Sequence, residues 1–207
     1  MLRLGAGEFP GTAHLDSAAL VFRGGAKLAV ALNTVKAADV AKAGELRVTH
    51  TGGVFSLLLG DRATAEKWAL KVRYPKSLID KLGLKPESRV AVLGVDDAEF
   101  RKQAAARLKS PPLTRLPPNP PAAGGGLDFI FYPADSEAEL ARLTELKHHL
   151  APTGAIWVVS LKGKAARVKD VDVMRAAKAA GLVDNKVCGF SATHTALKLV
   201  IPVAARG

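Results

Sequence analysis

Four basic side chains stand within eight residues, directly after an apolar run that has the composition of a buried parallel strand, Ala155–Val159. Ligands of open α/β sheets bind beyond the carboxyl ends of such strands. Ammonium and guanidinium groups at that edge can hold a phosphate or a carboxylate. The sequence therefore predicts a candidate anion-binding site, with a solvated basic loop as the alternative. The four residues are Lys162, Lys164, Arg167 and Lys169.

The other residue types that commonly do chemistry have no partner at a recognisable spacing. His148 and His149 are neighbours on a predicted helix, so their side chains should point in different directions and form no two-histidine metal face. His194 falls in a predicted turn and Cys188 in a predicted strand. Because Cys188 is the single cysteine, an internal disulfide and a cysteine-based zinc site are both excluded. We expect no catalytic residue of a recognised type and no metal.

The first 74 residues are expected to form a small antiparallel β domain closed by one helix. The strongest hairpin signal pairs the alternating run Leu46–His50 with Val54–Leu59 across a glycine-containing turn. Over residues 63–73, apolar side chains recur at spacings of three and four, which predicts an amphipathic helix with Trp68 facing the sheet. This order of elements is similar to small pleckstrin-homology-like domains. Tyr74-Pro75 should end the helix and the domain.

From residue 75 to residue 207, apolar runs alternate with helical patterns, which predicts an α/β unit with a mostly parallel sheet. Two strands near the end, over residues 184–190 and 196–202, should form an antiparallel hairpin. A helix is expected over residues 136–150, where Ser136 and Glu139 have the spacing of a capping box. Six of the twelve prolines fall in residues 111–121 and three glycines follow. The stretch 110–126 is therefore predicted to be a loop.

The chain carries a formal net charge of +11, spread evenly as +4 in residues 1–75, +4 in 76–126 and +3 in 127–207. A nucleic-acid footprint usually concentrates on one face, so nucleic-acid binding rests on net charge alone. No apolar run approaches the roughly 20 residues of a membrane span, and the start does not resemble a secretory signal. We expect a soluble, cytoplasmic protein without membrane insertion.

Several segments of the second half resemble Rossmann-fold methyltransferases, in the order that these enzymes have along the chain. Residues 81–94 resemble the lead-in to the first strand, 150–158 the run from helix to fifth strand, and 180–183 with the final hairpin the C-terminal end. The match covers about residues 78–203. With its β-rich leader, the whole chain resembles an uncharacterised bacterial family with a methyltransferase-like fold. The resemblance implies a shortened Rossmann sheet and brings no established activity.

The resemblance places a departure from the family pattern at the cofactor site. Methyltransferases have a glycine-rich turn after the first strand, where the backbone approaches adenosylmethionine at a helix N-terminus. Here Gly94 matches, but Asp96 and Ala98 stand at the second and third glycine positions. We expect Asp96 to fill space that the cofactor needs and, with Asp97, to repel its carboxylate. The residues expected to replace the second strand contain Arg115 and no acid for the ribose hydroxyls.

These observations favour a non-catalytic binding or regulatory protein on a degenerate methyltransferase-like scaffold, without adenosylmethionine. The expected partner is an anionic ligand or another protein. A divergent adenosylmethionine-dependent methyltransferase or nucleotide-binding enzyme is the first alternative, and a nucleic-acid-binding protein is the second. The second and third strands of the family, with their helix, are expected to have shrunk into the proline-rich loop.

Overall fold

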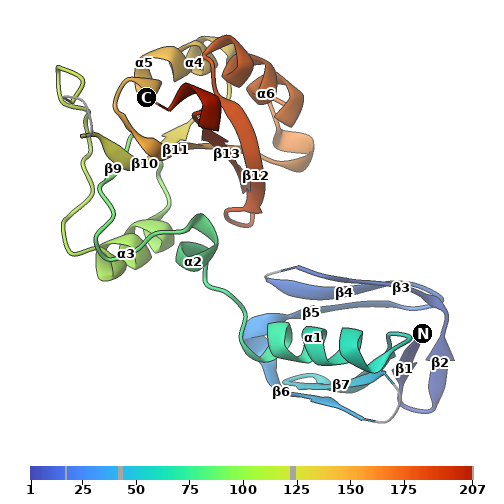
Figure 1. The fold of residues 1–207 in the computed structure, drawn as a ribbon. Helices are drawn as coiled ribbons and strands as arrows, with labels where there is room; N and C mark the ends of the chain where they lie inside the picture. Colours follow the sequence, from blue (N-terminus) through green and yellow to red (C-terminus); the bar gives the residue numbers. More distant parts are fainter. Residues whose placement is uncertain (17, 42–43, 122–124, 207) are drawn as a thin grey trace. The chain divides into compact units, whose positions relative to one another are not determined.

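The computed structural model describes residues 1–16, 18–41, 44–121 and 125–206. The chain divides into two compact units, Met1–Ser77 (unit 1) and Leu78–Gly207 (unit 2); the colours of Figure 1 follow the sequence from blue at the N-terminus to red at the C-terminus. Part of the predicted glycine-containing loop, residues 122–124, lies outside the described residues. No helix among the described residues is long and apolar enough to cross a membrane.

Within its described residues, unit 1 has a five-stranded sheet of order β2-β1-β8-β7-β6, a three-stranded sheet of order β3-β4-β5, and one long helix, α1. All the strand pairs are antiparallel. Buried side chains from both sheets and from α1 form a single apolar cluster. The elements are β1 (Leu2–Leu4), β2 (Gly7–Phe9), β3 (Gly11–Leu15), β4 (Ala19–Gly24), β5 (Lys27–Ala31), β6 (Val35–Val40), β7 (Glu45–His50), β8 (Gly53–Leu58) and α1 (Arg62–Arg73).

The hairpin predicted from alternation is confirmed, because β7 and β8 pair from Glu45↔Leu58 to His50↔Gly53. Helix α1 begins where an acceptor is available: the carboxylate of Asp61 accepts hydrogen bonds from Thr64 N at 2.8 Å and Thr64 Oγ1 at 2.7 Å. Trp68 lies on the inner face of α1, partly buried against the apolar cluster.

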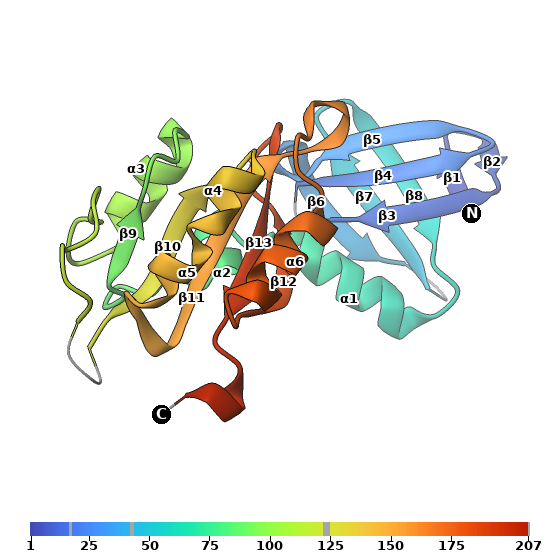
Figure 2. The same cartoon turned by 90° about the horizontal axis from the view of Figure 1, so that it is seen from above.

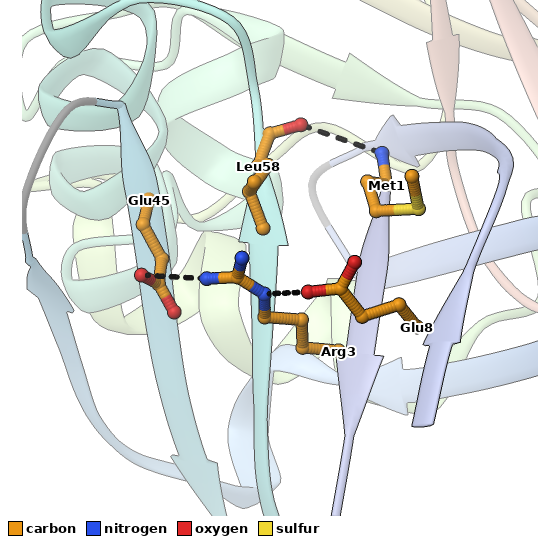
Figure 3. A network of polar contacts seen from close by, with 5 residues as sticks. All are labelled: Met1, Arg3, Glu8, Glu45 and Leu58. Carbon is orange, nitrogen blue, oxygen red and sulfur yellow. Dashed lines mark hydrogen bonds and ion pairs between the residues drawn. The ribbon is translucent and has the colours of Figure 1, made fainter. Parts of the chain in front are cut away.

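A polar network joins the first strands to the middle of the larger sheet (Figure 3). Arg3 on β1 contacts Glu8 on β2 at 2.6 Å and Glu45 on β7 at 3.3 Å. The hydrogen bond that Arg3 donates to the Glu8 carboxylate raises the pKa of the Arg3 guanidinium. Met1 N lies 3.5 Å from Leu58 O on β8. Because these side chains are solvent-exposed, the network aligns the strands more than it stabilises the unit.

The sheet of unit 2 has the order β12-β13-β11-β10-β9, which Figure 2 shows side by side. Strands β9, β10 and β11 are parallel, whereas β13 and β12 are antiparallel additions. Helices α2 and α3 lie on one face and α4, α5 and α6 on the other (Figure 1). The predicted α/β arrangement with a final hairpin is confirmed. The elements are α2 (Leu78–Leu82), β9 (Val90–Val92), α3 (Ala98–Arg107), β10 (Leu127–Pro133), α4 (Glu137–Ala141), α5 (Leu143–Lys147), β11 (Leu150–Leu161), α6 (Asp170–Ala179), β12 (Val183–Gly189) and β13 (His194–Val200).

The single helix predicted over residues 136–150 is wrong. Ser136 does cap α4, since its hydroxyl accepts from Glu139 N at 3.3 Å. The helix then tightens at Arg142, whose N–H bonds to the carbonyl of Glu139 three residues back, and α5 begins after it. Leu150, expected on the helix, instead begins β11 and pairs with Leu127 of β10. Strand pairing has overridden the helical spacing of the leucines.

The proline-rich loop, residues 110–126, is called the connector from here on. Its Leu113 forms a one-residue parallel bridge with Ala91 on the outer side of β9. Leu113 N donates to Val90 O at 2.8 Å, and Val92 N donates to Leu113 O at 2.8 Å. Among its described residues the connector forms no longer strand and no helix, as its composition predicts.

Trp157 is the largest side chain buried completely in the protein. It lies on β11 and packs in the apolar cluster that joins the sheet to α2 and α3. Its Nε1–H donates to Leu82 O, at the end of α2, across 3.2 Å. This residue therefore fixes α2 on the sheet through both apolar burial and a buried hydrogen bond.

Candidate functional site

A cavity of about 690 Å³ opens beside the carboxyl ends of β9 and β10; we call it the Gly94 cavity. Its volume lies within the roughly 300–1,000 Å³ typical of small-molecule sites. Ligands of open α/β sheets bind at this edge. The lining residues come from the β9 end, the connector, β10 and the α4–α5 segment: Leu93, Gly94, Thr114, Arg115, Leu116, Pro117, Pro118, Pro120, Tyr132, Arg142, Glu145, His148 and His149.

The turn after β9 has the backbone conformation that favours glycine. Gly94 has a φ of +76°, and a Cβ there would meet only Pro133 Cγ, at 3.6 Å. Backbone conformation, not crowding, therefore requires glycine at this position. A smaller cavity of about 270 Å³ also borders Gly94 and Thr114 and is lined by Arg101 of α3. The backbone of the turn is thus accessible from two cavities.

The structure does not place the side chain of Asp96, which was expected to fill space that the cofactor needs, in either cavity. Its side chain is 94% exposed and points to Arg101, with Oδ1 3.7 Å from Nη2. Asp97 accepts from Phe100 N at 2.8 Å and caps α3, in which Ala98 is the first residue. Neither aspartate lines the Gly94 cavity or the smaller one. Capping fixes Asp97 at the helix, and the exposed Asp96 faces a guanidinium, so both carboxylates leave the cavities open.

Arg101 was not identified from the sequence, yet it changes the charge at this turn. Its Nε donates to Val95 O at 2.9 Å, which holds the guanidinium beside the turn. It also lines the smaller cavity. The guanidinium of Arg101 therefore partly balances the negative charge of Asp96 at this turn.

A cluster of three side chains forms one wall of the Gly94 cavity. Arg142 Nε and Nη2 donate to the carboxylate of Glu145 at 3.1 and 3.4 Å. The Arg142 guanidinium also lies 5.5 Å from the ring centroid of Tyr132. Burial raises the pKa of Tyr132, and the hydrogen bond from Arg142 lowers the pKa of Glu145. At neutral pH the cluster therefore presents a neutral phenol, a guanidinium and a carboxylate.

His149 is the buried polar residue of this cavity. It is 6% exposed, and its Nδ1 has no hydrogen-bond partner among the described residues. A buried polar atom left unpaired costs about 1–3 kcal/mol. The exposed His148 lines the same cavity. Among the described residues there is no group of three side chains that could hold a metal ion.

The predicted anion site at the basic run remains a prediction. Lys162 donates from Nζ to Ser191 O at 2.8 Å, which ties the loop after β11 to the turn before β13. Lys164 lies in a short 3-10 turn, and Lys169 precedes α6 with its N–H bonded to Asp172 at 3.0 Å. Arg167 is exposed. None of the four lines the Gly94 cavity or its smaller neighbour.

Cys188 should react slowly with thiol reagents in the folded protein. It is 6% exposed on β12, and burial raises the pKa of its thiol, so the reactive thiolate is scarce below that pKa. At pH 8, modification by a chromogenic disulfide should be at least about tenfold slower in native protein than in guanidinium chloride. Rapid stoichiometric modification of the native chain would contradict this burial.

Comparison with known proteins finds no matching family model and no matching curated protein. Among solved structures, the chain is similar to a putative methyltransferase from Thermoplasma acidophilum, with TM-score 0.43 and 8% identity over 74% of this chain and 80% of that one. A putative type 11 methyltransferase from Sulfolobus solfataricus gives 0.41 and 14% over 56% and 84%. Magnesium protoporphyrin IX methyltransferase from Synechocystis, with SAM (adenosylmethionine) bound, gives 0.39 and 13% over 60% and 74%.

These matches correct two expectations drawn from the sequence. The similar structures are methyltransferases, and one contains the cofactor. The comparisons speak against the non-catalytic interpretation and against the exclusion of adenosylmethionine, and neither expectation is kept. At such identities the likeness concerns the fold alone.

Proposed function

We propose that unit 2 is a divergent adenosylmethionine-dependent methyltransferase with a shortened sheet. The observation that carries the proposal is the open Gly94 cavity at the carboxyl end of β9, which Asp96 leaves clear. The one-residue bridge of Leu113 beside β9 is consistent with a lost second strand, replaced by the connector. In this proposal the second strand beside β9 has been lost, whereas the turn at Gly94 after β9 is kept.

The residues around the turn fit such a cofactor by chemistry. Gly94 lets a ligand approach the backbone closely, because glycine adopts the left-handed conformation of this turn and has no side chain. Arg101 and Arg115 offer guanidinium groups for a carboxylate. The acid expected for ribose hydroxyls is absent from the connector segment that follows β9, but Glu145 of α5 supplies a carboxylate in the same cavity.

When bound, adenosylmethionine supplies an electrophilic methyl group on its sulfonium. The chain's part is to bind and orient. Tyr132 stays protonated at neutral pH because burial raises its pKa, so its phenol can donate a hydrogen bond without adding charge. The leucine and proline side chains of the lining exclude water from one side of the cavity.

Titration calorimetry of the full chain with adenosylmethionine and adenosylhomocysteine tests the proposal. We expect saturable binding of both, together with a rise in the unfolding temperature. Ligand at 100 times its Kd would stabilise the folded state by about 2.7 kcal/mol. A nucleotide panel of AMP, ATP and NAD serves as the comparison. No binding of either adenosyl compound overturns the proposal, and selective binding of a panel member identifies a nucleotide-binding enzyme instead.

A further inference from the structure

We infer that the α5 end of the Gly94 cavity binds a small organic anion, one with an apolar ring and a carboxylate or phosphate group. The α5 end is the part lined by Arg115, Arg142, Glu145, His148 and His149. This site goes beyond the proposed function, because its ligand is of a different chemical class from the cofactor, although Arg115 and Glu145, named above for the cofactor, line it as well.

The connector creates the space for this ligand. Leu113 and Thr114 run beside β9 toward its carboxyl end, and the chain then returns to Leu127, which begins β10 at the opposite edge. The register pairs Leu127 with Leu150 and Pro133 with Val159, a span of about 20 Å along the strands. The cavity touches residues near both edges, from Gly94 to His149.

The wall that the connector contributes is apolar and has few hydrogen-bond donors. Pro117, Pro118 and Pro120 line the cavity. Proline has no N–H, and its ring is a compact apolar surface. Such a wall suits the face of a hydrocarbon ring and offers little to a polar ligand, so polar recognition must come from the side of α5.

The charge of the lining selects an anion. Arg115 and Arg142 line the cavity together with a single carboxylate, that of Glu145. Arg115 has no ion pair or hydrogen bond among the residues described for this chain, so its guanidinium is available to a ligand. Arg142 uses two of its five N–H donors on Glu145. A carboxylate or phosphate can therefore be held by charge-assisted hydrogen bonds.

His149 is the second, independent sign of a ligand. It lines the cavity, it is more than nine-tenths buried, and Nδ1 has no partner in the described structure. Buried polar atoms in native proteins are nearly always satisfied, and exceptions commonly mark sites of function or of bound water. A hydroxyl on the ring of the ligand, opposite the anionic group, is a suitable partner for this imidazole.

Matched probes test the inference on the full chain by titration calorimetry and by NMR of the histidine rings. Benzoate, phenyl phosphate and benzamide share a ring and differ in the polar group. We expect one of the two anions to bind at least about tenfold more tightly than neutral benzamide. The preferred anion distinguishes a carboxylate from a phosphate ligand. Equal affinity for all three probes, or no binding, overturns the inference.

Charge-removing variants locate the anion. Arg115→Gln and Arg142→Gln should each weaken binding of the preferred anion about tenfold. Lys178→Gln removes the same charge from an exposed position on α6 and should change nothing. The exposed Arg115 variant is expected to fold even if the Arg142 variant does not. Unchanged anion affinity in Arg115→Gln, with the Lys178 control also unchanged, overturns the assignment of the site.

His149→Phe keeps a ring in place and removes both nitrogens. Wild-type protein should prefer 4-hydroxybenzoate to benzoate, and the variant should lose that preference, whereas a persisting preference removes His149 from the site. The two proposals fail separately. Anion binding without adenosylhomocysteine binding removes only the methyltransferase proposal, and the reverse result removes only this one.

Discussion

Replacing Gly94 by alanine is expected to weaken adenosylhomocysteine binding more than about tenfold, equivalent to 1.4 kcal/mol. Gly94 has a φ of +76°, and a non-glycine residue in the left-handed region costs about 1–2 kcal/mol. The turn can relieve this cost only by changing its backbone angles. Any such change moves the peptide groups that border both cavities. Calorimetry of the variant beside the wild type measures the loss.

Gly163 provides a matched control for that substitution. Its φ is +67°, and a Cβ there would meet nothing within 4 Å. An alanine at Gly163 therefore has the same unfavourable backbone conformation as an alanine at Gly94 and clashes with no neighbour. Gly163 lies in the basic loop after β11 and lines neither cavity. Gly163→Ala should lower stability like Gly94→Ala and leave ligand affinity intact. Equal affinity losses in the two variants would trace the effect to general destabilisation.

Replacing Trp157 by alanine should lower the free energy of unfolding of unit 2 by about 3–5 kcal/mol. The side chain is fully buried, so its removal leaves a large cavity, and Leu82 O loses its 3.2 Å donor. Stabilities of whole domains are only about 5–15 kcal/mol, so most of unit 2's stability could be lost. Urea unfolding followed by circular dichroism measures the change.

A second variant of Trp157 separates packing from hydrogen bonding, and a variant of Trp68 serves as its counterpart in unit 1. Trp157→Phe keeps an aromatic ring and removes only the N–H and part of the volume, so a smaller loss of about 1–3 kcal/mol is expected. Trp68→Ala changes the partly buried tryptophan of unit 1. Since the chain has two tryptophans, each alanine variant leaves a fluorophore that reports on the other unit. A Trp157→Ala protein with an unchanged midpoint would refute the packing described for β11 and α2.

Elements with a strong local pattern were predictable from the sequence. The hairpin of β7 and β8 differs from its prediction by one residue at three of its four ends. Strands β1 and β2 were missed, because Leu2–Leu4 and Gly7–Phe9 are short and separated by glycine. β1 pairs with β8, a non-local contact that no short window of sequence contains, and β2 joins the sheet only through β1.

The site was harder to predict than the fold. The sequence shows that Asp96 carries a carboxylate, but it does not show where that side chain points. Its direction depends on Asp97, which caps α3, and on Arg101, one helical turn away. Tyr132 and Arg142 were placed on a strand and on a continuous helix. The break at Arg142 decides which way α5 runs, and tertiary contacts decide that break. A lost glycine motif is therefore weaker evidence of a lost site than it appeared.

The single bridge at Leu113 has a consequence for how the protein behaves at high concentration. β9 would otherwise end the sheet with a row of unpaired backbone groups, and such edges invite strand addition from other molecules. The backbone of Leu113 forms hydrogen bonds with the carbonyl of Val90 and the N–H of Val92. Pro111 and Pro112 beside it lack the N–H that a further strand would need. The connector thus covers the β9 edge of the sheet and opposes aggregation through strand addition at that edge.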